Sequence, residues 1–112
     1  MLVYKILRRP EWEALRRTGE TLGAPVDLAD GFIHFSTAAQ VVETAAKHFA
    51  AESDLVLVAV DTARLGDALR WEPSRGGQLF PHLYAPLRLE HVAWDKSLPL
   101  GAAGHIFPEG VL

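Results

Sequence analysis

The segment 31–37 contains side chains whose spacing could serve a ligand site. In an extended strand, neighbouring side chains point to opposite faces, so Ile33 and Phe35 can face a core while His34 and Ser36 share the other face. A helix is expected to follow, and its first N–H groups carry partial positive charge. That combination suits an anionic ligand such as a phosphate. The alternative is that His34 is a hydrogen-bonded, half-buried histidine and Ser36 only caps the helix.

A second candidate is the segment 80–84, where an extended chain would place Phe80, His82 and Tyr84 on one face. Aromatic and imidazole groups together can stack a planar ring and transfer a proton. The glycine pair at 76–77, just upstream, could form a mobile flap. The alternative is an aromatic corner packed on a sheet, with His82 bonded to a backbone carbonyl.

Trp71 and Glu72 form a third candidate, at the end of an expected strand. A glutamate beside a tryptophan could be an acid with a raised pKa, or a carboxylate that holds a hydroxyl group. Alternatively, Glu72 is solvated or paired with Arg70 or Arg75.

Several common site types have no support in this sequence. The five histidines show no metal-ligand spacing with a carboxylate partner, so no metal site is predicted. The chain contains no cysteine, which excludes thiolate ligands and a cysteine nucleophile. Neither a serine-hydrolase elbow, a dinucleotide glycine motif nor a P-loop occurs.

The elements that must position these residues can be read from periodicity and from capping residues. Pro10 and Gly19 bracket one helix, and the Thr37–Gln40 capping box opens another, with an apolar face running from Ala38 to Phe49. A continuous apolar run predicts a strand covered on both faces at 55–60. These patterns predict an α+β domain with two early helices. The expected helices are 10–18 and the one from 37; the expected strands are 2–7, 32–36, 55–60, 69–72, an extended 80–84 and 91–98, with turns at 19–30 and an irregular segment at 100–112.

Length and composition narrow the class further. A chain of 112 residues fits one domain, 1–112, and 49% hydrophobic with 22% charged residues is typical of globular proteins. The net charge of −3, without a basic stripe, argues against nucleic-acid binding. The longest apolar run, Leu55–Val60, is too short to span a bilayer, and the first ten residues lack a secretion signal. A cytoplasmic protein that does not bind membranes is therefore expected, and its oligomeric state stays open.

Four blocks of this sequence resemble a single family. The Gly-Phe-Ile-His-x-Ser and Pro-His-Leu-Tyr motifs occur in the same order as in domain-of-unknown-function family 952, a set of short, mostly bacterial proteins. The family has no assigned activity and is grouped by fold with the ADP-ribosyltransferases. The segment 31–36 is similar to the Gly-x-Ile-x-Phe-Ser strand of poly-ADP-ribose polymerases. The blocks are Tyr4–Ile6, Asp30–Thr37 with Gln40, Leu69–Glu72 and Phe80–Tyr84.

This resemblance implies an ADP-ribosyltransferase-like fold with small mixed or antiparallel sheets, and a cleft that takes NAD as substrate rather than as a bound cofactor. Those transferases carry a glutamate in their third motif, whereas the comparable stretch 81–84 has no carboxylate. Glu72 can replace it only if the fold brings it to the cleft. The predicted catalytic residues are His34, His82 and Glu72, and the predicted substrate contacts are Gly31, Ser36, Thr37, Trp71, Phe80 and Tyr84.

Three functions are compatible with these observations. The chain could be an enzyme that transfers or hydrolyses an ADP-ribosyl group at its anomeric carbon. It could be a domain that binds a nucleotide or another small anion without catalysis. Alternatively, its aromatic corner could pack against a protein partner or a second copy of the chain. Ligand-induced changes confined to 31–37 and 80–84 would separate the first two from the third.

Overall fold

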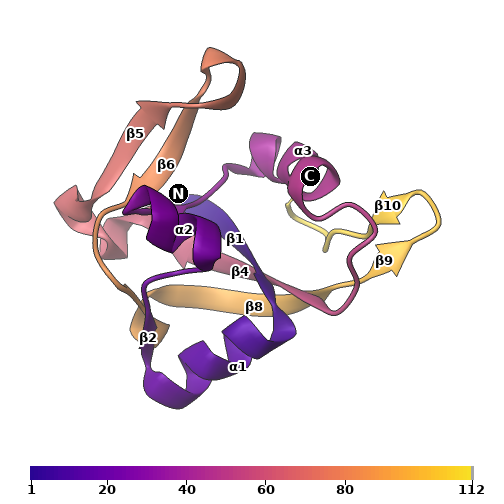
Figure 1. Cartoon of the computed structure of the whole chain (residues 1–112), viewed down its shortest axis with the longest axis horizontal. Coiled ribbons are helices and arrows are strands. Elements are labelled where there is room, and N and C mark those ends of the chain that lie inside the picture. The colour runs from indigo at the N-terminus through magenta and orange to yellow at the C-terminus, as the bar shows by residue number, and fades with distance from the viewer. Residues whose placement is uncertain (112) are drawn as a thin grey trace.

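A three-stranded antiparallel sheet, in the order β1-β4-β8, lies at the centre of the computed structural model (Figure 1). The structure describes residues 1–111, apart from the side chain of Arg75. The three strands are β1 (Leu2–Arg8), β4 (Leu55–Asp61) and β8 (Val92–Leu98). All residues of the run Leu55–Val60 are buried, which confirms the prediction of a strand covered on both faces.

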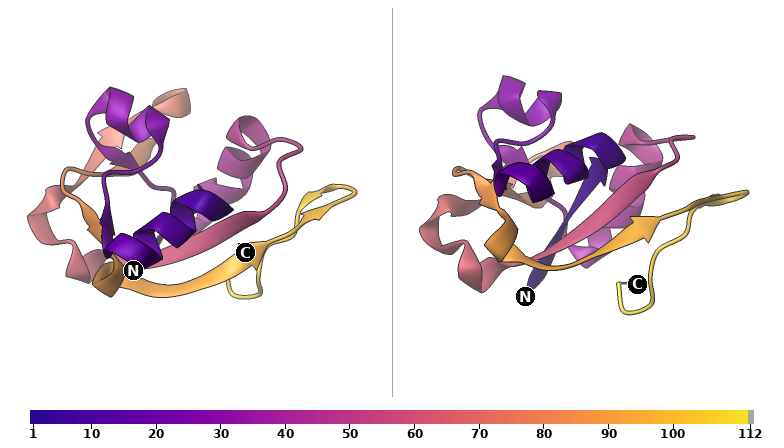
Figure 2. Two further views of the ribbon diagram at one scale, coloured as in Figure 1. Left: turned by 60° about the horizontal axis from the view of Figure 1, so that its bottom comes forward. Right: turned by 90° about the horizontal axis from the view of Figure 1, so that it is seen from below.

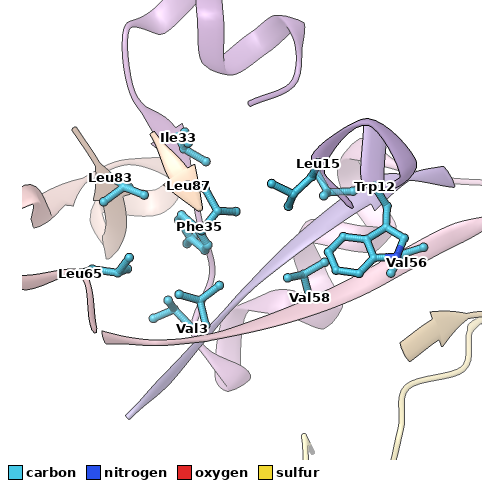
Figure 3. Close-up of a cluster of buried hydrophobic side chains, with 12 residues drawn as sticks. Val3, Trp12, Leu15, Ile33, Phe35, Val56, Val58, Leu65, Leu83 and Leu87 are labelled. Atoms are coloured by element: carbon cyan, nitrogen blue, oxygen red, sulfur yellow. The ribbon is translucent and has the colours of Figure 1, made fainter. Parts of the chain in front are cut away.

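The two faces of this sheet are covered by different helices. Helix α1 (Arg9–Thr18) packs Trp12 and Leu15 against the alternate residues Val56 and Val58 of β4 (Figure 3). Helix α3 (Ala38–His48) packs its own apolar residues against the opposite face of β4. Side chains on a strand alternate between faces, so a single apolar run serves both clusters.

A second antiparallel sheet, in the order β3-β6-β5, contains residues from all three candidate segments predicted from the sequence. Its strands are β3 (Ile33–His34), β6 (Leu79–Leu83) and β5 (Leu69–Pro73). The β5–β6 hairpin projects from the body of the molecule (Figures 1 and 2). Because His34 pairs with His82 across β3 and β6, the predicted segments 31–37 and 80–84 are neighbours.

The predicted strand 32–36 is shorter than expected, because this segment crosses between the two sheets. Its first part pairs with β6, and the N–H of Phe35 still donates to the carbonyl of Pro81 at 2.9 Å. Ser36 has already left that sheet and exchanges two backbone hydrogen bonds with Tyr4 of β1, at 2.8 and 2.9 Å. The segment 33–36 thus joins the sheets.

The prediction of two helices is wrong, because a third helix, α2 (Pro25–Asp30), lies within the segment expected to be turns. Pro25 occupies its start, and Gly31 ends it with a left-handed backbone (φ 82°). Six residues are too few to show a helical apolar period. The predicted ends of α1, near Pro10 and Gly19, and the start of α3 at Thr37 are confirmed.

The C-terminal segment 100–112 is not wholly irregular, because β9 (Leu100–Gly101) and β10 (Gly104–His105) form a small antiparallel hairpin. Leu112, the end of that prediction, lies outside the described residues. No helix within 1–111 is long and apolar enough to span a membrane. The remaining elements are the paired strands β2 (Glu20–Thr21) and β7 (Leu87–Arg88), and the 3-10 helices η1 (Thr62–Arg64), η2 (Gly66–Ala68), η3 (Arg75–Gly77) and η4 (Leu89–His91).

Candidate functional site

A pocket of about 950 Å³ lies where the two sheets meet. Residues of β1, β3, β6, α2 and α3 form its walls. Four of the residues singled out from the sequence line it: His34, Ser36, Phe80 and His82. Ile33 and Phe35 are buried in the core at 2% exposure. Strand alternation therefore turns His34 and Ser36 toward the pocket, although Phe35 is also among the lining residues.

A chain of alternating basic and acidic side chains lies at one wall of the pocket, where Lys5, His34 and Asp30 are lining residues and Asp27 is fully buried. Lys5, from β1, places its Nζ 2.7 Å from Oδ2 of Asp27. Oδ1 of Asp27 accepts hydrogen bonds from the backbone N–H of His34 at 3.0 Å and from its ring Nδ1 at 2.6 Å. On its other side, Nε2 of His34 lies 2.9 Å from Oδ2 of Asp30. Both ring nitrogens of His34 thus face a carboxylate oxygen, Nδ1 through a hydrogen bond with Asp27 and Nε2 through a close contact with Asp30.

Asp27 is held in place from every side. Its side chain is fully buried, and its Oδ2 also accepts the backbone N–H of Ala24 at 2.8 Å. Gly23, with a φ of 103°, passes so close that a Cβ there would collide with the carboxylate. Burial works to raise the pKa of Asp27, but the hydrogen bonds from His34 and the charge of Lys5 outweigh it and lower the pKa to about 2. Burial also lowers the pKa of Lys5, and Asp27 opposes that effect.

The lowered pKa of Asp27 predicts a loss of stability in acid. A carboxyl whose pKa is about 2 in the folded chain, against an ordinary 3.8, stabilises the fold above pH 3.8. That contribution, about 2 kcal/mol, disappears as the pH falls from about 4 to about 2. Urea unfolding at a series of pH values measures it. An Asp27→Asn variant should show a shallower decline over this interval; an equally steep decline would assign the effect to other carboxyls.

A second histidine–carboxylate pair lies beside the first. Nδ1 of His82 is 2.8 Å from Oε1 of Glu72, and the same oxygen accepts the hydroxyl of Tyr84 at 2.7 Å. The hydrogen bond from Tyr84 and then the one from His82 lower the pKa of Glu72, while Glu72 raises the pKa of Tyr84. In a neutral imidazole whose proton lies on Nδ1, toward Glu72, the other nitrogen, Nε2, is an acceptor. Nε2 is buried and has no hydrogen-bond partner within residues 1–111.

The ring of Phe32 holds the two histidines together. Its centroid lies 4.1 Å from that of His82, 4.6 Å from that of His34 and 5.2 Å from that of Tyr84. The two imidazole rings themselves meet nearly edge to face at 5.4 Å. A flat aromatic side chain thus fixes the orientation of both rings without using their nitrogens.

Comparison with known proteins identifies the family of this chain. The family described as "Protein of unknown function (DUF952)" matches residues 6–95. This chain belongs to that family. The crystal structure of protein CC0527 from Caulobacter crescentus is similar to it, with 51% identity over 94% of this chain and 92% of that one, and a TM-score of 0.90. The solution NMR structure of CC0527 gives 52% identity, coverages of 93% and 90%, and a TM-score of 0.83. A search of curated proteins gives no match.

In this DUF952 chain, four of the six predicted substrate contacts lie outside the pocket lining: Gly31, Thr37, Trp71 and Tyr84. Gly31 is the left-handed residue that ends α2, and Thr37 is the N-cap of α3. Trp71 is 40% exposed on β5. Tyr84 donates to Glu72, and the ligand contacts of these four residues stay predictions.

Glu72, predicted to be catalytic, lies beside His82 and outside the pocket lining of this DUF952 chain. Its carboxylate contacts His82 and Tyr84 and is absent from the pocket wall, so Glu72 positions His82. Of the two arginines expected to pair with it, Arg70 lies over the Tyr84 ring at 5.0 Å. The side chain of Arg75 is outside the described part of the structure.

Sequence reasoning missed Lys5, Asp27 and Asp30 in this DUF952 chain. The available signal was Lys5, a charge inside the otherwise apolar strand Leu2–Leu7. A lysine buried among apolar residues requires an anionic partner. Asp30 precedes His34 by four residues, but with a helix end and a turn between them no simple period connects the pair.

Proposed function

We propose that the pocket binds NAD or another ADP-ribosyl-type small molecule, and that the chain acts on its anomeric carbon by transfer or hydrolysis. The observation that carries this proposal is His82, with one nitrogen fixed by Glu72 and the other buried, unpartnered and in a residue that lines the pocket. A base oriented by a carboxylate is a common way to activate a nucleophile. The resemblance of segment 31–36 to the ADP-ribosyltransferases, and an α+β fold of antiparallel sheets, support the substrate class.

The chemistry suits a histidine that accepts through Nε2. In hydrolysis, the oxygen of water forms a bond to the anomeric carbon while the bond from that carbon to the ring nitrogen of nicotinamide breaks. The bonding electrons return to the nicotinamide ring and neutralise its positive charge. The water proton passes to Nε2 of His82, and Glu72 stabilises the imidazolium that results. In transfer, a hydroxyl or amine of an acceptor replaces water.

The size and surface of the pocket agree with a ligand of this kind. A volume of about 950 Å³ lies at the upper end of the range for small-molecule sites. Phe80 and Phe49 give part of the wall an aromatic character, and Ser36 and Thr44 add a hydroxyl pair whose oxygens are 2.8 Å apart. Such a wall can stack a flat ring and orient polar groups around it.

A parallel NMR titration with NAD, ADP-ribose and nicotinamide tests the binding. We expect saturable shifts of the His34 and His82 ring signals and of the Ser36 and Tyr84 amides, because these residues line or support the pocket. Signals of the C-terminal hairpin, such as that of His105, should not move and serve as the control. Flat spectra with all three ligands at millimolar concentration would contradict the proposal.

One observation favours a second function, binding without catalysis. Glu72 stands behind His82, and the stretch 81–84 supplies no carboxylate to the pocket. A site of this kind can hold an ADP-ribosyl compound and leave its glycosidic bond intact. Binding without release of nicotinamide would identify this case.

A further inference from the structure

Asp30 presents a carboxylate to the pocket and had no role in the sequence-based prediction. It is the last residue of α2, it lines the pocket, and its side chain is 47% exposed. Oδ2 of Asp30 is fixed by Nε2 of His34 at 2.9 Å. We infer that Asp30, held by His34, contacts the ligand directly, and that the ligand presents a vicinal diol to it, as a ribose does. This inference rests on the proposed function and specifies how the substrate is recognised.

His34 itself has no nitrogen left for a ligand. Asp27 takes Nδ1 at 2.6 Å and Asp30 takes Nε2 at 2.9 Å. Asp27 is in turn anchored by Lys5 and by two backbone N–H groups, so the ring cannot turn away without breaking several bonds. His34 is therefore a positioning residue, and the chemistry predicted for it passes to Asp30.

The hydrogen-bond acceptors in the pocket wall around Asp30 indicate which chemical group a ligand should present there. Asp30 offers carboxylate oxygens, which accept only, and Nε2 of the neighbouring His82 is a buried acceptor without a partner. Two acceptors, one at the end of α2 and one on β6, suit a ligand that donates. Phosphate oxygens would be repelled by the carboxylate, so this end of the pocket suits the sugar rather than the pyrophosphate.

A neutral donor fits the electrostatics better than a cation does. The wall alternates the basic side chains of Lys5 and His34 with the carboxylates of Asp27 and Asp30, so each carboxylate already has a basic partner. An ammonium or guanidinium ligand would bring a second basic group to Asp30, next to His34. Two adjacent hydroxyl groups can satisfy a carboxylate without bringing any charge.

The test compares ligand affinities of the wild-type chain and an Asp30→Asn variant. Asparagine keeps the size and can still present an oxygen to Nε2 of His34, so a purely structural role would survive the change. We expect the affinity for ADP-ribose to fall about 10- to 100-fold, because hydrogen bonds to a charged group are lost. Asp95→Asn, at an exposed position of β8, is the matched control and should bind as the wild type does.

A second pair of probes examines the diol itself. The wild type should prefer ribose 5-phosphate to 2-deoxyribose 5-phosphate about 10-fold, and Asp30→Asn should lose this preference. If His34 acts through Asp30, adding His34→Gln to Asp30→Asn should weaken binding no further, a non-additivity that a double-mutant cycle measures.

The outcomes separate the two proposals. Binding of ADP-ribose by the wild type with an undiminished affinity in Asp30→Asn overturns the role of Asp30 and leaves the proposed function standing. Equal affinity of the wild type for ribose 5-phosphate and 2-deoxyribose 5-phosphate likewise overturns the inference that Asp30 binds a vicinal diol. If the wild type does not bind ADP-ribose at all, the proposed function fails and the inference fails with it.

Discussion

An Asp27→Asn variant is expected to lose about 3–5 kcal/mol of unfolding free energy, because it leaves the ammonium of Lys5 buried without an anion. The side chains of Lys5 and Asp27 are 8% and 0% exposed, and Nζ and Oδ2 are 2.7 Å apart. Asparagine fills the same space and can still accept a backbone N–H, so the loss reports charge rather than shape. Urea unfolding followed by circular dichroism measures it.

Two further variants isolate the cause of that loss. Asp54→Asn removes an exposed carboxylate that pairs with Arg9 at 3.3 Å, and it should change the stability by less than about 1 kcal/mol. Adding Lys5→Met to Asp27→Asn removes the unpaired charge and should recover a large part of the stability. A loss below about 1 kcal/mol in Asp27→Asn alone would mean that Lys5 finds another partner or loses its proton at little cost.

The parts of the fold that depend on local patterns could be predicted from the sequence. The apolar run Leu55–Val60 can only be a strand buried on both faces, and it is. Pro10 and Gly19 mark the ends of α1 because proline suits the first turn and glycine tolerates a left-handed backbone. Each of these signals lies within a few residues of the structure it determines.

The charge chain of the pocket could not be predicted, because its members come from separate elements. Lys5 lies on β1, Asp27 in a helix too short to show a period, and His34 on a two-residue strand. Only the crossing of segment 33–36 between the sheets brings them together, through the bridge of Ser36 to Tyr4. Sequence reasoning therefore found His34 and missed Asp27 and Asp30, the two carboxylates that contact its ring nitrogens.

The pair of His82 and Glu72 could likewise be predicted only in part: the residue types were found from the sequence, but the strand register that brings them together was not. Phe80, His82 and Tyr84 were expected to share a face, and the structure places His82 and Tyr84 on the same oxygen of Glu72. The role of Glu72 depends on how β5 pairs with β6. In that register Glu72 lies opposite Phe80, two pairs along from the pairing of Arg70 with His82. Nothing local to residues 69–73 determines that pairing.

If the chain releases nicotinamide from NAD, a His82→Gln variant is expected to lower kcat about 100- to 10,000-fold, the usual contribution of a general base. Glutamine keeps a polar group near Glu72 but cannot take a proton from the nucleophile. KM should change little, because the step affected is proton transfer rather than binding. Chromatographic measurement of free nicotinamide under steady-state conditions gives both constants.

Variants of the residues that support His82 should lower kcat less than His82→Gln does. The effect should become smaller as the residue lies further along the hydrogen-bond chain from His82. Glu72→Gln removes the charge that stabilises the imidazolium of His82, and its effect on kcat should lie between those of His82→Gln and Tyr84→Phe. The hydroxyl of Tyr84 bonds to Glu72, so its removal should lower kcat least. His91→Gln, in η4 and outside the pocket, is the control. If Glu72→Gln abolished turnover while His82→Gln did not, Glu72 rather than His82 would be the group acting on the substrate, and the order of residues derived from the hydrogen bonds would be wrong.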